Sequence, residues 1–248
     1  MCWDVAKQVL LDSNSPAEVQ LFAAQTLKNR ARLCRTAPLQ QCQALQHDVL
    51  GVLAQRSDAL PQLMKQLCLA LVDLSLPAGD TLPGLISHVT GALPATTALL
   101  TLEYMAEEVG LMTHFGLGGS NEERVEALME LKARLRGCAG GVFSWLSHQA
   151  KQPGPPGHAA RVLACFNAWT RLGSLQALQN QDDLQALVGL ALTHLRTPES
   201  EAFEASADAL SEVIDHCPEA WLSALQVCVF VCGRFRSPSG AIDDVFDP

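Results

Sequence analysis

The stretch from residue 60 to residue 76, LPQLMKQLCLALVDLSL, decides the fold of this chain. Its apolar side chains are three or four residues apart, at Leu60, Leu63, Met64, Leu67, Leu71 and Leu74. On an α-helix, that spacing places them on one face. Pro61 stands near the start of the stretch, and a Pro-Ala-Gly-Asp run follows it at 77–80. The pattern therefore predicts one amphipathic helix, over residues 59–76, with turns on both sides.

The same period recurs on both sides of this stretch. Apolar runs extend from Leu39 to Leu53, from Val162 to Leu172 and from Phe203 to Cys217, and they are separated by Pro- and Gly-containing turns. Helices are predicted at 2–12, 17–35, 38–56, 59–76, 82–92, 94–109, 121–149, 158–178, 183–196, 199–216 and 219–233. The one at 121–149 is unusually long, and Gly137, Gly140 and Gly141 predict a kink in it.

These helices group into pairs whose second members begin near residues 17, 59, 94, 158 and 199. The usual step is roughly 40 residues, the period of HEAT-type repeats. A single pair cannot cover its own apolar face, so pairs of this kind must stack. The sequence therefore predicts an all-α fold, an α-solenoid superhelix of antiparallel helix pairs over residues 1–235. Residues 236–248 are predicted to be a disordered acidic tail.

Composition narrows the class of protein. Hydrophobic residues make up 48% of the 248 residues, aromatic residues only 5%, and the formal net charge is -9. An acidic surface repels phosphate backbones, so we expect no direct contact with nucleic acid. The nine cysteines form no C-x-x-C pair, which favours free thiols in a reducing compartment. Neither a signal peptide nor a membrane span is expected, because the apolar run Ala224 to Cys232 is too short for a bilayer.

Signals for catalysis are weak. Asp243, Asp244 and Asp247 have the D-D-x-x-D spacing that binds magnesium and diphosphate in helical terpenoid synthases. They stand at the end of the chain without a second acidic motif, so a solvated acidic tail is the preferred interpretation. Asp182 and Asp183 are interpreted as an N-cap or as dipole partners of the helix that follows. Cys228 and Cys232 are one helical turn apart, but no further ligand completes a metal site. We expect no enzyme activity, metal or cofactor.

Five segments resemble members of the importin-β superfamily of nuclear transport receptors, in the transportin-SR and importin-thirteen branch. The first reads LFAAQTLKNR at 21–30 and is similar to the inner helix of the second repeat in that family. The others are QLCLALVDLSL at 66–76, LLTLEYMAEEV at 99–109, CFNAWTRLG at 165–173 and FEASADAL at 203–210. They occur in the family's order and at solenoid spacing, over nearly the whole chain.

The resemblance implies a function in nucleocytoplasmic import of protein cargo. Receptors of this family bind the small GTPase Ran, in its GTP state, along the inner helices of the first repeats. Carried over by position, the residues that would face Ran are Gln25, Lys28, Asn29, Arg32, Asp73, Glu103 and Glu107. A solvated helix face remains the alternative for Lys28 and Arg32, and a contact with a neighbouring turn or backbone group for Asp73. Phe22, Leu67, Leu71, Phe166, Trp169 and Leu210 are expected to be core.

Further partners implied by the resemblance are Arg-Ser-rich cargo proteins and the Phe-Gly segments of nucleoporins, the latter on the outer helices 121–149 and 183–196. The implied location is the nucleus and the cytoplasm. Family members begin one repeat earlier, so this chain corresponds to a piece of such a receptor, and the helix at 2–12 is expected to have an uncovered apolar edge. The alternative is a generic HEAT-repeat scaffold for protein–protein assembly.

Overall fold

The computed structural model describes residues 2–34, 39–56, 60–75, 82–113, 120–173, 175, 180–197 and 200–216. Within these ranges the chain forms eleven α-helices and no strand, which confirms the predicted all-α class. The helices are α1 (Cys2–Leu11), α2 (Ala17–Leu33), α3 (Leu39–Gln55), α4 (Pro61–Ser75), α5 (Leu82–Ala92), α6 (Ala95–Leu111), α7 (Asn121–Gly137), α8 (Ala139–Ala150), α9 (His158–Arg171), α10 (Gln181–Leu195) and α11 (Phe203–His216). The predicted helix at 219–233, the tail at 236–248, Cys228, Cys232 and the Asp243–Asp247 motif lie outside the described residues.

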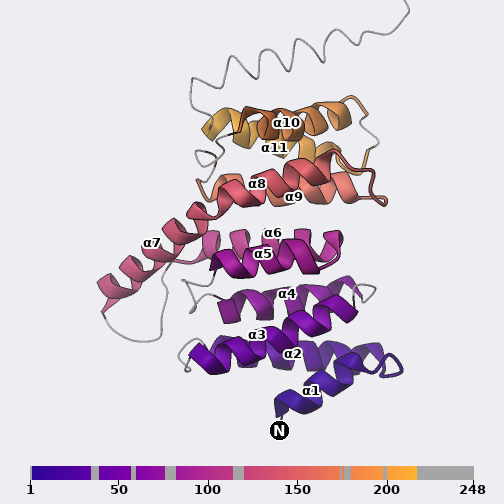
Figure 1. The fold of residues 1–248 in the computed structure, drawn as a ribbon, viewed down its shortest axis with the longest axis vertical. Helices are drawn as coiled ribbons and strands as arrows, with labels where there is room; N and C mark the ends of the chain where they lie inside the picture. The colour runs from indigo at the N-terminus through magenta and orange to yellow at the C-terminus, as the bar shows by residue number, and fades with distance from the viewer. Residues whose placement is uncertain are drawn as a thin grey trace, which may run out of the picture.

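The helices are arranged in two layers. Consecutive helices pack together as α1 on α2, α3 on α4, α5 on α6, α8 on α9 and α10 on α11. Close packing also links α2 to α4, α4 to α6, α6 to α9 and α9 to α11, so these five form one continuous layer. Figure 1 shows the helices stacked in chain order along the longest axis of the molecule. The helices predicted as second members of pairs are the five of the continuous layer.

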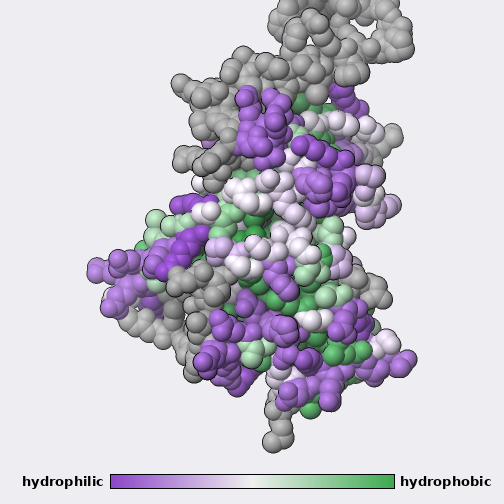
Figure 2. All heavy atoms as spheres, in the orientation of Figure 1, coloured by the Kyte–Doolittle hydropathy of each residue, from purple (hydrophilic) through white to green (hydrophobic). Residues whose placement is uncertain are grey.

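The predicted long helix at 121–149 is two helices. α7 ends at Gly137, α8 begins at Ala139, and the backbone turns at Cys138 between them. Ser120 and Glu123 form a capping box that fixes the start of α7. α7 buries only Leu128, Leu131 and Leu135, and Figure 1 shows it projecting from the side of the stack. Hydrophilic residues cover much of it, whereas weakly polar and apolar residues gather around α5 in the middle of the same face (Figure 2).

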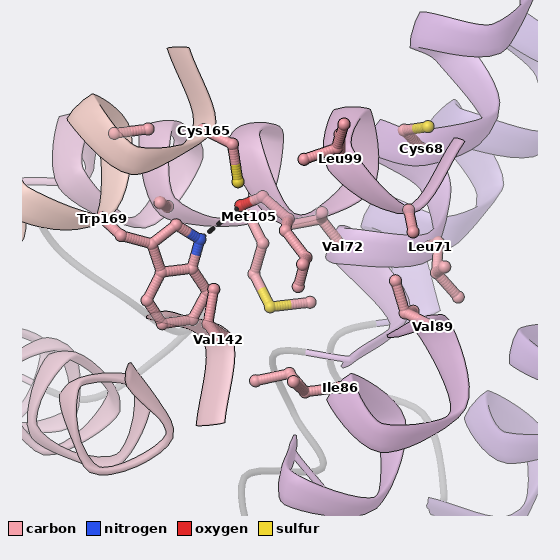
Figure 3. Packing of buried hydrophobic residues seen from close by; sticks show 14 of the residues in the cluster. Cys68, Leu71, Val72, Ile86, Val89, Leu99, Met105, Val142, Cys165 and Trp169 are labelled. Atoms are coloured by element: carbon pink, nitrogen blue, oxygen red, sulfur yellow. Dashed lines mark hydrogen bonds between the residues drawn. The ribbon is translucent and has the colours of Figure 1, made fainter. Parts of the chain in front are cut away.

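The core is continuous between the layers. Trp169 of α9, Met105 of α6, Val142 of α8 and Ile86 of α5 lie close together in Figure 3, and each is buried. The indole Nε1 of Trp169 donates a hydrogen bond of 3.0 Å to the carbonyl oxygen of Leu102. Burying a large apolar side chain contributes about 1.5–3 kcal/mol, so this cluster is a main source of stability where the two halves of the chain meet.

Several helix ends are fixed by basic side chains, which donate to carbonyl groups that have no partner within the helix. Arg56 donates to the carbonyl oxygen of Leu10 at the end of α1 and also to the side chain of Gln20. Arg136 donates in the same way to the carbonyl oxygen of Leu172, just after α9. Gly173 follows with a φ of 73°, which is unfavourable for other residues. The helix predicted to reach residue 178 therefore ends at Arg171.

Most residues predicted to be core are buried, but Phe22 is not. Leu67, Leu71, Phe166 and Trp169 are buried, and Leu210 is partly buried against the same cluster. The prediction for Phe22 is wrong, because its side chain is 71% exposed. Phe22 lies on the face of α2 opposite the buried Ala24, Leu27 and Ala31, and no described helix covers it. The expected uncovered edge of the first helix is present, since Val5 is 60% exposed.

Cys34, Cys42, Cys68, Cys138 and Cys165 are free thiols, and all but Cys138 are buried. None of the helices that the structure describes combines the length and the apolar character needed to cross a membrane.

Candidate partner-binding surface

The predicted site residues lie on three neighbouring helices of the continuous layer. α2 packs against α4 and α4 against α6. On these helices the candidate residues are Gln25, Lys28, Asn29 and Arg32 on α2, Asp73 on α4, and Glu103 and Glu107 on α6. The structure therefore brings these three helices side by side, but it exposes only some of the predicted side chains.

The four polar residues of α2 are accessible. Gln25, Asn29 and Arg32 are exposed and Lys28 is half-buried. Spacings of three and four place them on one side of the helix, and the opposite side carries the buried residues that pack on α4. They form a polar strip with a positive charge at its C-terminal half. Their accessibility is compatible both with partner binding and with the alternative of a solvated helix face.

Asp73 does not present its carboxylate at the surface. It is 4% exposed and lies in the half of α4, from Leu67 to Ser75, where every residue is buried. The prediction that it faces a partner is corrected, because α4 is enclosed by α2, α3 and α6 at this level. The alternative interpretation, an interaction inside the protein, agrees with its burial.

Glu103 is also an internal group. Its side chain is 11% exposed and forms an ion pair of 3.2 Å with Arg161 of α9, whose side chain is 40% exposed. Burial raises the pKa of Glu103, and the charge of Arg161 opposes that rise. Glu103 therefore links α6 to α9, and the prediction that it faces a partner is corrected. Glu107, one turn further along α6, is exposed.

Two more polar contacts on this layer were not apparent from the sequence. The ammonium group of Lys65 on α4 lies 5.3 Å from the centre of the Tyr104 ring on α6. Arg171 of α9 forms an ion pair of 2.5 Å with Glu212 of α11, and this hydrogen bond raises the pKa of Arg171. Together with the Glu103–Arg161 pair, these contacts join successive helices of the layer. Each partner is on a different helix, so no local sequence pattern identifies it.

The described residues contain several His, Cys, Asp and Glu side chains. No group of three or more His, Cys, Asp or Glu side chains among them is placed to hold a metal ion. Burial raises the pKa of Cys68 to about 12 and that of Cys165 well above its ordinary value. Such thiols are protonated near pH 7, so Cys68 and Cys165 pack as small apolar groups.

A separate cavity of about 590 Å³ lies between the α8–α9 turn and the start of α11. His194 and Ser200 line it, and His194 Nδ1 is 2.8 Å from the hydroxyl oxygen of Ser200. That hydroxyl oxygen also accepts a hydrogen bond from the backbone N–H of Ala202. Ser200 therefore stabilises the turn before α11 through these hydrogen bonds, as Ser residues commonly do at helix starts.

The chain matches no protein-family model, and no curated protein matches it significantly.

Proposed function

We propose that this chain is a segment of a nuclear transport receptor that binds Ran-GTP and carries protein cargo into the nucleus. In this proposal the two layers are an α-solenoid of antiparallel HEAT-type pairs with superhelical curvature. The continuous layer, from α2 to α11, is the inner side. Support comes from the five segments that resemble importin-β receptors and from the spacing of the stacked pairs along the chain.

The observation that carries the proposal is the accessible polar strip of α2. Gln25, Lys28, Asn29 and Arg32 lie on the helix whose sequence resembles the Ran-binding inner helix of the family, and none is fully buried. Glu107 on α6 is exposed on the same layer. These five residues remain the proposed Ran contacts, whereas Asp73 and Glu103 are proposed to support the layer from inside.

Further partners are assigned to other parts of the molecule. α7 exposes Val125 (41%) and Met129 (58%), apolar side chains of the kind that the Phe-Gly segment of a nucleoporin would cover. Protein cargo, including Arg-Ser-rich proteins, is proposed to bind the same receptor, in the nucleus and the cytoplasm. Because Ran-GTP and cargo would bind different curvatures of the solenoid, each would weaken the binding of the other.

The test is nucleotide-dependent binding of Ran to the chain, measured by calorimetry or by interferometry at low salt. Ran loaded with a non-hydrolysable GTP analogue is expected to bind more tightly than Ran-GDP. A Lys28→Glu, Arg32→Glu double variant is expected to weaken that binding about ten-fold, mainly through slower association. The matched control is Arg134→Glu with Lys151→Glu, which reverses two exposed charges away from α2.

Two results would count against the transport proposal. One is the same affinity for Ran-GTP and Ran-GDP, or no binding of either. The other is equal loss of affinity in the α2 variant and in the control. The alternative function, a generic HEAT-repeat scaffold, would then remain, since such a scaffold binds proteins without regard to the nucleotide on Ran.

A further inference from the structure

The cavity of about 590 Å³ between the α8–α9 turn and the start of α11 has the size and lining of a ligand site. Pro155, Pro156 and Leu190 form apolar parts of its wall, whereas His158 and Glu201 are polar. Ligand sites commonly have volumes of about 300–1,000 Å³ and combine apolar walls with a few polar groups. Figure 1 shows α8 to α11 in the upper half of the stack and α2 near its lower end, so the cavity is separate from the polar strip of α2.

The wall formed by the α8–α9 turn has a defined shape. Nε2 of the His158 ring is 3.3 Å from the carbonyl oxygen of Gln149. Because a carbonyl oxygen only accepts hydrogen bonds, Nε2 carries the proton, and Nδ1 of the neutral ring is left as an acceptor. A Cβ atom on Gly154 would overlap the ring of His158, so the chain has to pass the ring with a glycine at this position. The turn is therefore fitted closely around a histidine that lines the cavity.

The opposite wall of the cavity supplies a carboxylate. Glu201 lies in the turn before α11 and is exposed. Its Oε2 atom is 3.4 Å from the position that a Cβ on Gly157 would occupy, so the carboxylate reaches the α8–α9 turn from the other side of the cavity. Among the described residues that line the cavity there is no Lys or Arg, and Glu201 is the only Asp or Glu. A negative charge with no positive charge beside it in the lining favours a cation as the ligand.

We propose that this cavity binds a lysine side chain, presented by a peptide segment of a partner protein. The ammonium group donates hydrogen bonds to the carboxylate of Glu201 and to Nδ1 of His158, and the aliphatic stem lies against Pro155, Pro156 and Leu190. The cavity is several times larger than one lysine side chain, so the residues on either side of the lysine also fit. The site does not depend on the proposed function, because a transport receptor and a HEAT-repeat scaffold both bind protein segments.

Two other kinds of cation fit the cavity less well. An arginine side chain ends in a planar guanidinium group that typically stacks on aromatic rings, and the described residues of the lining include no Phe, Tyr or Trp. A free diamine such as cadaverine has the same ammonium group and stem as lysine, but it leaves most of the cavity unfilled. We therefore expect a lysine peptide to bind more tightly than an arginine peptide or cadaverine.

The experiment measures binding of a short, capped and fluorescently labelled peptide, one lysine flanked by alanines, to the full chain by fluorescence anisotropy. Glu201→Gln is expected to weaken binding about ten-fold, because the ammonium group loses its ionised acceptor. Ala160→Leu narrows the cavity without changing a charge and is expected to abolish binding. The matched control is Glu204→Gln, which removes an exposed carboxylate on α11 outside the lining and is expected to leave binding unchanged. A peptide with acetylated lysine, which keeps the stem but not the charge, is expected to bind about ten-fold more weakly.

Glu201 is exposed and Ala160 is half-buried, so both variants are expected to fold, and retained helicity checks this. The proposal is overturned if the lysine peptide does not bind, if Glu201→Gln and Glu204→Gln have the same effect, or if Ala160→Leu leaves binding intact. Equal affinity for the acetylated peptide overturns the part assigned to the charge. An arginine peptide or cadaverine that binds as tightly as the lysine peptide overturns the choice of a lysine-bearing segment as the ligand.

Discussion

Removal of the guanidinium group of Arg161 tests whether the ion pair between α6 and α9 holds the continuous layer together. Arg161→Met keeps the length and apolar character of the side chain but leaves Glu103 without its partner. The Glu103 side chain is only 11% exposed, so water cannot fully replace the lost contact. Breaking a fully buried pair costs about 3–5 kcal/mol. Because Arg161 is 40% exposed and Glu103 can take up a proton, we expect about 2 kcal/mol here.

A matched control is available on the projecting helix. Arg134 and Glu130 form an ion pair whose side chains are 40% and 62% exposed, so Arg134→Met is expected to cost no more than about 0.5 kcal/mol. Glu103→Gln in the Arg161→Met background is expected to recover much of the loss, since a neutral amide is easier to bury than a carboxylate. The measurement is urea unfolding combined with hydrogen exchange of α6 and α9, because stacked repeats need not unfold in two states.

The pH dependence of the Arg161→Met variant gives an independent check. Burial raises the pKa of Glu103 in the folded state, and the charge of Arg161 holds that rise back. Between the ordinary pKa and the raised one, the folded chain binds a proton that the unfolded chain lacks, so stability increases as the pH falls through that window. Removing Arg161 raises the pKa of Glu103 in the folded chain further, so this window extends to higher pH. The free energy of unfolding lost through Arg161→Met should therefore be smaller at pH 5 than at pH 7.5. Equal losses at the two pH values, or a loss no larger than that of Arg134→Met, would refute the reasoning.

Three further predictions concern the core, α7 and the thiols. Trp169→Phe removes the hydrogen bond to α6 and part of a fully buried ring, and urea unfolding should show a loss of about 1–2 kcal/mol. Ser120→Ala removes the capping box of α7 and should lower its local stability by about 1 kcal/mol, seen as faster hydrogen exchange in α7 but not in α2 or α4. At pH 8, an alkylating reagent followed by peptide mapping should modify the half-buried Cys138 before Cys68, whose pKa is raised to about 12.

Helix existence and pairing could be predicted from the sequence because both depend on local patterns. The apolar period of residues 60–76 produced α4, and the spacing of the second pair members matched the helices of the continuous layer. The ends of helices were less predictable. The break at Cys138 depends on where α7 leaves the stack, and the early end of α9 depends on Gly173 and on Arg136, more than thirty positions away.

The candidate site was harder to predict, because exposure depends on which helices cover a given face. Phe22 has the apolar character of a core residue, but no described helix packs on its side of α2. Glu103 has the polarity of a surface residue, but the fold places Arg161 beside it from 58 positions along the chain. Neither the exposure of Phe22 nor the burial of Glu103 can be predicted from neighbouring residues in the sequence. Both residues were predicted to be in the opposite environment.

The two layers differ in how closely their helices approach one another. Close packing runs without interruption from α2 through α4, α6 and α9 to α11, whereas α5 approaches only α6 closely among the helices that the structure describes. We expect such a stack to be stiff along the continuous layer and easier to deform on the opposite side. Bending is therefore expected mainly around α5. It would change the spacing between α3 and α8 while the helices of the continuous layer keep their contacts.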